Sequence, residues 1–400
     1  MSWASIDRAT ADLDGPVVVL DRSALEANVA DLRRRAAGVP IRVASKSIRV
    51  RSVIDDILRR DGFAGVLAYD IDEAIWLATE SGITDVLMGY PTARRASIAA
   101  LADDDVASAR VTLLVDSVDH LDLIDAAAPP GRRNPVRVAI DLDASLRAPV
   151  LGHIGVLRSP VHTVPEATAL ARAIVDRPGV DLVGVMSYEA QVAGVGDAIS
   201  GGWRSGAPLR NRAIRAMQSA SMAELRHRRG AAIAAIRQIA DLEFVNGGGT
   251  GSIEATAADE SVTDIAAGSG FFGGHLFDNY SRFHPSPALA FGLQVVRRPT
   301  AGVITCHGGG WIASGPPAPD RLPRPVWPQG LAYEPREAAG EVQTPLRGDA
   351  ADQLAIGDRV WFRHTKSGET SEHATQIVIV DDDTAVESVP TYRGEGKCFL

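Results

Sequence analysis

The sequence of 400 residues contains only two cysteines, Cys306 and Cys398, which lie far apart and outside any spacing typical of a metal site. We therefore expect neither a disulfide framework nor a cysteine-bound zinc ion. No apolar run approaches the ~20 residues that a membrane-spanning helix needs. Residues 1–15 also lack the apolar core of a signal peptide. Together these absences predict a cytoplasmic protein.

The chain also lacks an excess of positive charge, because 41 Lys and Arg face 50 Asp and Glu and give a formal net charge of −9. We therefore expect neither nucleic acid nor a membrane as a bulk partner. A small anionic ligand stays possible, since a few local donors can hold it. The hydrophobic share of 46% and the charged share of 23% are typical of an ordered globular protein.

Between residues 41 and 270 the chain alternates short apolar runs with helical patterns. Helical segments such as 51–61 and 71–81 are each followed by a glycine. Eight such units favour an α/β fold of the (β/α)8 barrel type, spanning 22–280, over an open doubly wound sheet, which is the structural alternative. The apolar runs have the length and character of strands buried on both faces of a parallel sheet, and they are 41–47, 65–70, 85–90, 111–116, 136–143, 182–188, 243–247 and 263–267.

Two regions interrupt this alternation. A long excursion at 190–230, before a strong helical pattern at 223–240, predicts a lid or wall of the site. Beyond about residue 280 the helical pattern stops, and a proline-rich stretch leads into strand-like runs at 358–363 and 376–380. We therefore predict a second, mostly β domain over 281–400, joined by residues 1–21. The strand at 17–21 could alternatively pair with the barrel.

Polar residues stand where several predicted barrel strands end, which is where barrel enzymes carry their chemistry. Lys46 closes the first strand, Arg147 follows the fifth, and Tyr188 and Glu189 end the sixth. A lysine in an apolar run can be structural, with its ammonium reaching a carboxylate at the barrel mouth. If it is buried, its pKa falls and it can act as a nucleophilic amine.

Two glycine-rich turns follow the last two predicted strands, at 246–251 and at 268–270. Backbone N–H groups in such turns converge on anions, and hydroxyl side chains add donors. One such turn is more often a tight connection, but two after adjacent strands recur in barrel phosphate sites. The predicted phosphate ligands are Gly249, Thr250, Gly268, Ser269 and Gly270.

Taken together, these motifs resemble the alanine-racemase-like, fold-type III pyridoxal-phosphate (PLP) enzymes. Within that family the chain is most similar to the amino acid deaminase/aldolase branch, which is related to D-threonine aldolase and D-serine dehydratase. The resemblance implies a TIM-type barrel with a mostly β C-terminal domain, assembled as a homodimer. It rests on VASKS with Lys46, IDLDASLR with Arg147, VMSYEAQ with Tyr188, FVNGGGTGS with Thr250, AAGSG at 266–270, and GDRVWFRHTKSGE and VPTYRGEGK in the second domain.

The resemblance also implies roles for these residues. Lys46 would hold PLP as a Schiff base, the two glycine-rich turns would bind its phosphate, and Tyr188 would line the cofactor. Arg147 would face the pyridine nitrogen. A guanidinium there disfavours a protonated pyridinium and weakens the electron sink, which suits retro-aldol cleavage, elimination or racemisation better than transamination.

The chain departs from its relatives at one place in the second domain. Metal-dependent relatives carry a histidine followed two residues later by Asp or Cys, whereas this chain has His364-Thr365-Lys366. A lysine ammonium cannot ligate a metal. We therefore expect no divalent metal and regard His364 and Lys366 as the acid–base groups. The alternatives are a structural His364, or a metal held by His364 with Glu369 and His373.

The function that this resemblance implies is a PLP-dependent lyase that cleaves or dehydrates a β-hydroxy-α-amino acid. The first alternative is an amino acid racemase with Lys46 on one face of the substrate and a second base opposite. The second is a non-catalytic PLP-binding homeostasis protein. Such proteins are typically barrel-only, so the long C-terminal segment counts against that alternative.

Overall fold

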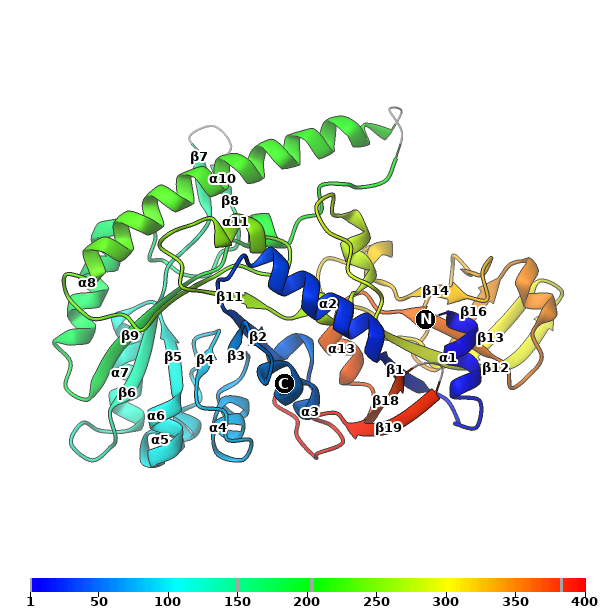
Figure 1. The fold of residues 1–400 in the computed structure, drawn as a ribbon, viewed down its shortest axis with the longest axis horizontal. Coiled ribbons are helices and arrows are strands. Elements are labelled where there is room, and N and C mark those ends of the chain that lie inside the picture. Colours follow the sequence, from blue (N-terminus) through cyan, green and yellow to red (C-terminus); the bar gives the residue numbers. More distant parts are fainter. Residues whose placement is uncertain (1, 149–151, 202–204, 382–383) are drawn as a thin grey trace.

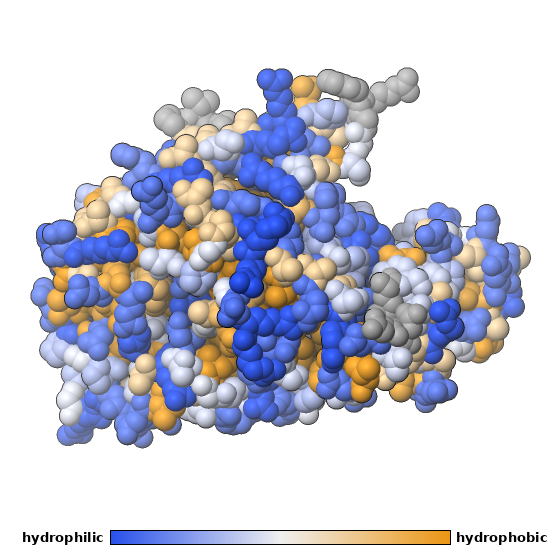
Figure 2. All heavy atoms as spheres, viewed as in Figure 1, coloured by the Kyte–Doolittle hydropathy of each residue, from blue (hydrophilic) through white to orange (hydrophobic). Residues whose placement is uncertain are grey.

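The computed structural model describes residues 2–148, 152–201, 205–381 and 384–400. It consists of a helix-covered barrel and a second lobe built mainly of strands, which lie side by side in Figure 1. Figure 2 shows the same face, with polar side chains spread over both lobes and apolar ones in small groups between them. Among the described residues, no helix has the length and apolar character to cross a membrane.

Eight parallel strands close into a barrel, which confirms the predicted fold class. β11 pairs with β2 through Ile265 and Ile41, so the last strand meets the first. The strands are apolar nearly throughout because helices cover their outer face and side chains fill the interior. In barrel order they are β2 (Ile41–Ala44), β3 (Phe63–Ala68), β4 (Val86–Met88), β5 (Val111–Val115), β6 (Val136–Asp141), β9 (Val180–Ser187), β10 (Phe244–Gly247) and β11 (Asp264–Ala267).

Helices precede, connect and follow these strands. The first, α2 (Arg22–Arg35), begins where the Asp21 side chain accepts a hydrogen bond from the Ala24 N–H group. α8 begins with a capping box between Thr163 and Glu166. The other helices of the barrel are α3 (Arg51–Leu58), α4 (Ile71–Thr79), α5 (Arg95–Asp103), α6 (Asp105–Arg110), α7 (Val118–Ala127), α8 (Val164–Val175), α9 (Ala190–Ala193), α10 (Ala207–Ile236), α11 (Ile253–Ala257) and α12 (Ser269–Phe272).

The region expected to be an excursion at 190–230 is largely helical. α10 begins at Ala207 rather than near residue 223, and it runs across the top of the barrel in Figure 1. The second half of α10 carries its buried apolar residues, such as Met222, Leu225 and Ile233, whereas the first half is mostly exposed. The sequence pattern missed the first half because an exposed helix has no apolar stripe.

The second domain is a β-sheet in the order β15, β16, β13, β12, β1, β18, β19, with β17 pairing to β12 and β14. The N-terminal strand β1 (Val17–Asp21) pairs with β12 and β18. The alternative that this strand pairs with the barrel is therefore wrong. The remaining elements are α1 (Trp3–Ala9), β12 (Leu289–Thr300), β13 (Val303–His307), β14 (Arg324–Trp327), β15 (Ala332–Tyr333), β16 (Gln343–Arg347), β17 (Arg359–Arg363), α13 (Ser367–Ser371), β18 (Gln376–Asp381) and β19 (Thr384–Pro390).

A buried carboxyl group joins the two lobes. Glu73 on α4 is fully buried, and its oxygens accept hydrogen bonds from the Tyr69 N–H group and the Tyr392 hydroxyl, both at 2.8 Å. Loss of solvation raises the pKa of Glu73 from 4.5 to about 7. The folded protein therefore holds this proton more tightly than the unfolded chain does, so the carboxyl costs stability as the pH rises through this range.

We predict that Glu73→Gln raises the free energy of unfolding above pH 7, by up to about 3 kcal/mol. The amide keeps an acceptor for Tyr392 but carries no charge. The gain should shrink toward pH 5, as the pH approaches 4.5 and the unfolded wild type also begins to take up the proton. Denaturant unfolding of both proteins between pH 5 and pH 8.5 measures this difference. A gain that is independent of pH would contradict the assigned cause.

Candidate functional site

Lys46 lies in a short 3-10 turn, Ser45–Ser47, directly after β2. Its side chain is exposed, and its Nζ donates to the Tyr90 hydroxyl at 2.9 Å. The amine therefore stands at the C-terminal end of a barrel strand, as the sequence predicts. The expectation that this lysine is buried is wrong, since the side chain points out of the apolar run that precedes it.

Tyr90 and Arg158 belong to the same site, although the sequence reasoning selected neither. Tyr90 follows β4, and the Arg158 guanidinium lies 5.8 Å from the Tyr90 ring and 5.6 Å from the Tyr188 ring. One cation therefore lies near two aromatic rings, an arrangement that their π-faces favour. The signal that could have found Tyr90 is its position after the third barrel strand, where a tyrosine precedes Pro91.

These residues line a cavity of about 260 Å³ at the strand ends. Three aspartates, Asp116, Asp141 and Asp143, also line it. Loss of solvation raises the pKa of Asp141 to about 7, with a further contribution from the charge of Asp116, while Arg158 opposes the shift. Removal from water likewise raises the pKa of Tyr188 to about 12. The cavity therefore holds a weakly acidic phenol, a guanidinium and, at Asp141, a carboxyl group that keeps its proton to higher pH than usual.

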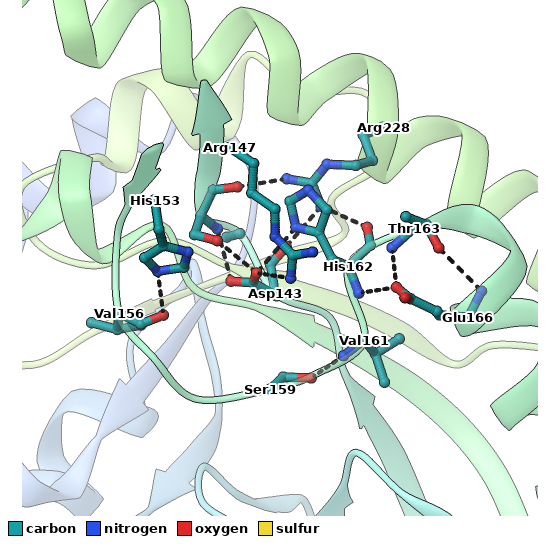
Figure 3. A network of polar contacts seen from close by, with 12 residues as sticks. Asp143, Arg147, His153, Val156, Ser159, Val161, His162, Thr163, Glu166 and Arg228 are labelled. Atoms are coloured by element: carbon teal, nitrogen blue, oxygen red, sulfur yellow. Dashed lines mark hydrogen bonds and ion pairs between the residues drawn. The ribbon is translucent and has the colours of Figure 1, made fainter. Parts of the chain in front are cut away.

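The structure does not bring Arg147 into this cavity. Arg147 lies on β7 (Leu146–Ala148), which pairs with β8 (Gly152–Ile154) in a hairpin inserted after β6. Its side chain is 50% exposed and stands 3.5 Å from Asp143, within a network that also contains His162 and Arg228 (Figure 3). The hairpin carries Arg147 outward, and the chain then returns with Arg158 beside the two tyrosines. Arg158 therefore replaces Arg147 as the candidate arginine.

The two glycine-rich turns contact each other. The Thr250 hydroxyl oxygen accepts from the Gly270 N–H group at 3.0 Å and from the Ser269 hydroxyl at 3.4 Å. Within the described part of the chain, the amide N–H groups of Thr250, Gly251 and Ser269 have no acceptor. Free amides and hydroxyls in adjacent turns have the donor chemistry that a phosphate group requires.

Close packing explains why glycine occupies several positions of these turns. A Cβ atom at Gly268 would lie 2.6 Å from the Ala44 carbonyl oxygen and 2.9 Å from the Ser47 Cβ atom, so the second turn packs directly beside the lysine turn. A Cβ atom at Gly249 would lie 3.0 Å from the Tyr188 ring. The predicted phosphate ligands, Tyr188 and Lys46 are thus brought to one end of the barrel.

Glu189 holds the first glycine-rich turn in place. Its buried carboxylate accepts from the Gly248 N–H group at 3.1 Å, from the Ser252 hydroxyl at 3.0 Å, and also from the Thr256 hydroxyl. The buried Arg229 guanidinium lies 3.6 Å from it and supplies the opposite charge. Glu189 therefore shapes the turn from below and does not line the cavity.

The family described as "Alanine racemase, N-terminal domain" matches residues 20–274, which is more than half of the chain. The chain belongs to the alanine-racemase-like, fold-type III PLP enzymes. The match ends at residue 274, directly before η3 (His275–Asn279) and the second domain, so it covers the barrel and all the strand-end residues described above.

Individual relatives extend this comparison. The 3-hydroxy-D-aspartate aldolase of Paracoccus denitrificans is 28% identical over 283 residues, which are 68% of this chain and 63% of that protein. The chain thus aligns with less than two thirds of the length of this curated relative. D-threonine aldolase from Filomicrobium marinum has a TM-score of 0.77 at 21% identity over 96% of both chains.

D-threo-3-hydroxyaspartate dehydratase from Delftia sp. HT23 has a TM-score of 0.72 at 19% identity, covering 95% of this chain and 97% of that one. One structure of this dehydratase is of a cysteine-to-alanine variant in a metal-free form. At these identities the solved structures show the fold alone, and they show it for both domains.

His364 was expected to act as an acid–base group, but its side chain is enclosed by the protein. It follows β17 and is buried, with Nδ1 donating to the Leu289 carbonyl at 2.9 Å. Nε2 therefore accepts from the Ser367 hydroxyl, at 3.0 Å. Burial lowers the pKa of His364 to about 3. Both nitrogens are occupied and the imidazole is a weak base, so His364 is poorly placed to take a proton from a substrate.

Lys366 is the better placed of the two predicted acid–base residues. It is half-buried, and its Nζ donates to the Ser314 carbonyl at 2.6 Å and the Ser314 hydroxyl at 3.0 Å. Burial lowers the pKa of Lys366, Glu369 partly opposes this effect, and the charges of Arg321 and Lys46 lower the pKa further. Because the charge of Lys46 affects the pKa of Lys366, the two amines lie on the same side of the site.

The other two residues of the alternative metal set, Glu369 and His373, have other partners. Glu369 accepts two hydrogen bonds from the Ser314 N–H group, and the His373 ring stacks on Trp311 with the ring centroids 5.1 Å apart. Across the described ranges, no three His, Cys, Asp or Glu side chains come together in a way that could hold a metal. The alternative set of His364, Glu369 and His373 is therefore not assembled.

Proposed function

We propose that this chain is a PLP-dependent lyase that cleaves or dehydrates a β-hydroxy-α-amino acid. The observation that carries the proposal is the exposed Lys46 amine beside two touching glycine-rich turns with free amide groups. The named activities of the relatives support it, since hydroxyaspartate aldolase, threonine aldolase and hydroxyaspartate dehydratase all act on β-hydroxy amino acids.

The residues at the barrel mouth fit PLP. Lys46 would hold the cofactor, the turns with Thr250 and Ser269 would bind its phosphate, and Tyr188 and Arg158 would line its ring. Bound PLP would supply an electron sink for cleavage next to the amino-bearing carbon. The permanently charged Arg158 would keep that sink weaker than an acidic partner would.

The residues of this chain would then handle the proton of the substrate hydroxyl. We propose that in aldol cleavage Lys366, as a neutral amine, accepts this proton while the hydroxyl oxygen becomes the carbonyl oxygen of the aldehyde. In dehydration the protonated Lys366 would instead donate a proton to the hydroxyl group, which leaves as water. Its lowered pKa brings the neutral form closer to working pH. His364 would act indirectly, by fixing Ser367 at the start of α13. No divalent metal is needed in this scheme.

A panel of β-hydroxy-D- and β-hydroxy-L-amino acids tests the proposed reaction. We expect an aldehyde from aldol cleavage or ammonia from dehydration, each assayed directly with the purified, PLP-loaded protein. Interconversion of enantiomers without either product would instead identify a racemase. Retention of bound PLP with no turnover of any substrate would indicate a non-catalytic PLP-binding protein.

We predict that Arg158→Gln alters the absorbance of bound PLP and lowers turnover by about tenfold or more, because a neutral amide replaces the guanidinium at the cofactor ring. Arg147→Gln is the matched control, since Arg147 lies on the neighbouring hairpin. It should leave both quantities within about twofold of wild type, the range expected for an exposed ion pair. If Arg147→Gln instead changed the absorbance and the turnover more than Arg158→Gln does, Arg147 would be the arginine at the cofactor.

We also propose that the protein works as a homodimer, the closed symmetry that soluble oligomers adopt most often. Light scattering of the active protein should give twice the mass of one chain. Separated subunits should lose activity if the partner completes the barrel mouth. A fully active monomer would refute this proposal.

A further inference from the structure

The turn that carries Lys46 is held by the second domain. The Ser371 hydroxyl donates to the Ile48 carbonyl at 2.9 Å, and the Tyr392 N–H group donates to the Arg49 carbonyl at 2.9 Å. A Cβ atom at Gly368 would lie 1.7 Å from the Lys46 carbonyl oxygen, so the backbone of α13 packs directly against the lysine turn. Three successive parts of the turn thus contact residues more than 300 positions later.

Arg49 is the centre of these contacts. Its Nε donates to the Lys46 carbonyl at 3.0 Å, and its Nη1 lies 2.6 Å from Glu372 of the second domain. The side chain is only 7% exposed, and the guanidinium also lies 4.8 Å from the Tyr69 ring. One planar guanidinium therefore joins the main chain of Lys46 to a carboxylate of the other domain, a geometry that a single amine could not reproduce.

The backbone of Arg49 shows that this arrangement is imposed by its surroundings. Its φ angle is +55°, in the left-handed region that a residue with a side chain rarely adopts. Such a conformation persists where neighbouring contacts determine it, and it often marks a functional turn. Here the contacts come from Glu372, Ser371 and the Tyr392 amide, which together with Arg49 we call the clamp.

The C-terminal residues extend the clamp toward the barrel. The Tyr392 hydroxyl donates to the buried Glu73, and the Tyr392 ring packs edge-on against Trp76 with the ring centroids 5.0 Å apart. The C-terminus accordingly lies beside α3 in Figure 1. Apart from its bond to Tyr90, the exposed Lys46 side chain depends on its turn for its direction.

We infer that Arg49 is a positioning residue: it fixes the main chain of Lys46 and so lets the second domain set how the amine is presented to PLP. This inference rests on the proposed role of Lys46. It predicts that loosening the clamp changes the local order of residues 46–49 and the rate at which Lys46 captures PLP. The barrel would then depend on the second domain for its reactive amine.

Four variants of the full-length protein test this inference. Arg49→Gln removes the guanidinium, and Glu372→Gln removes its partner from the other domain. Arg49→Gly removes the side chain but accommodates the left-handed backbone, so it separates side-chain contacts from backbone strain. Arg51→Gln is the matched control, because Arg51 also makes an ion pair with the C-terminal segment, at Glu395, but contacts Trp76 instead of the lysine turn.

Two measurements are made on each variant. Hydrogen exchange of amides 46–49 in the PLP-free protein reports on the clamp alone, and absorbance after mixing with PLP gives the rate of capture. We expect the three clamp variants to exchange faster at these amides and to capture PLP about tenfold more slowly or worse. Arg51→Gln should match wild type within about twofold on both measurements.

Wild-type exchange and capture rates in Glu372→Gln and Arg49→Gly would overturn the inference, as would an equal loss in Arg51→Gln. If the Arg49 variants do not fold, Glu372→Gln decides the question alone, because its carboxylate lies nearer the surface. If PLP does not attach to Lys46 in wild type, the proposed function fails. Exchange in the PLP-free protein still determines whether the clamp orders the turn.

Discussion

Replacing Lys46 with alanine should abolish the absorbance of bound PLP and lower turnover by on the order of 10⁴-fold or more, because no other group can replace a covalent nucleophile. The fold should survive this change. The Lys46 side chain is exposed, with the Tyr90 hydroxyl as its hydrogen-bond partner, so its truncation removes little packing. The melting temperature of the PLP-free variant should therefore stay close to that of PLP-free wild type.

Lys397→Ala is the matched control for this experiment. Lys397 is partly exposed, makes an ion pair with Glu80, and lies on the C-terminal segment away from the glycine-rich turns. It should keep both the bound-PLP absorbance and full turnover. Persistence of the absorbance in Lys46→Ala, together with substantial turnover, would contradict the assignment of Lys46.

Lys366→Ala should slow turnover by about 10²–10⁴-fold, the usual cost of removing a positioned acid–base group. The absorbance of bound PLP should persist, because Lys366 bonds to Ser314 and not to the glycine-rich turns. Chelation of wild type should change little. His364→Ala should also lose activity, but with a lowered melting temperature, since this buried imidazole bonds at both nitrogens.

A chelation experiment could contradict the metal-free scheme. If a chelator abolishes turnover and Mn²⁺ or Zn²⁺ restores it, Lys366 does not replace the missing metal ligand. Ser314→Ala provides a control for the geometry, because it removes one hydroxyl partner of Lys366 and leaves the carbonyl partner. It should affect turnover far less than Lys366→Ala does.

The barrel could be predicted from the sequence because its strands are buried on both faces and are therefore nearly continuous apolar runs. The glycine-rich turns after β10 and β11 could be found for a related reason, since strand order along a barrel puts them side by side. The first half of α10 could not be predicted in this way, because it is exposed and its sequence therefore shows no periodic apolar pattern.

The burial of individual side chains could not be predicted from the sequence. A position at a strand end fixes which end of the barrel a residue occupies but not whether it faces solvent. Lys46 was expected to be buried and is exposed, whereas His364 was expected at the site and is enclosed by Leu289 and Ser367. Arg147 lies in the first strand of the inserted hairpin and Arg158 follows its second strand, so only the pairing of the hairpin decides which of them reaches the barrel mouth.

Tyr90 shows a further limit of the sequence reasoning. Its hydroxyl meets Lys46 across the barrel mouth from a strand two places away in the barrel order. A single tyrosine after an apolar run is usually a packing residue, and only the closed barrel makes it a neighbour of the amine. The side chains that converge from different strands were therefore the hardest part of the site to predict.

Borohydride reduction of the PLP-loaded wild-type protein, followed by peptide mapping, tests the central claim most directly. The chain contains three lysines, Lys46, Lys366 and Lys397, so the pyridoxyl group has few possible positions. Our account predicts one pyridoxyl group per chain, attached to Lys46. A pyridoxyl group on Lys366 or Lys397, or an unmodified Lys46 in protein that had bound PLP, would contradict it.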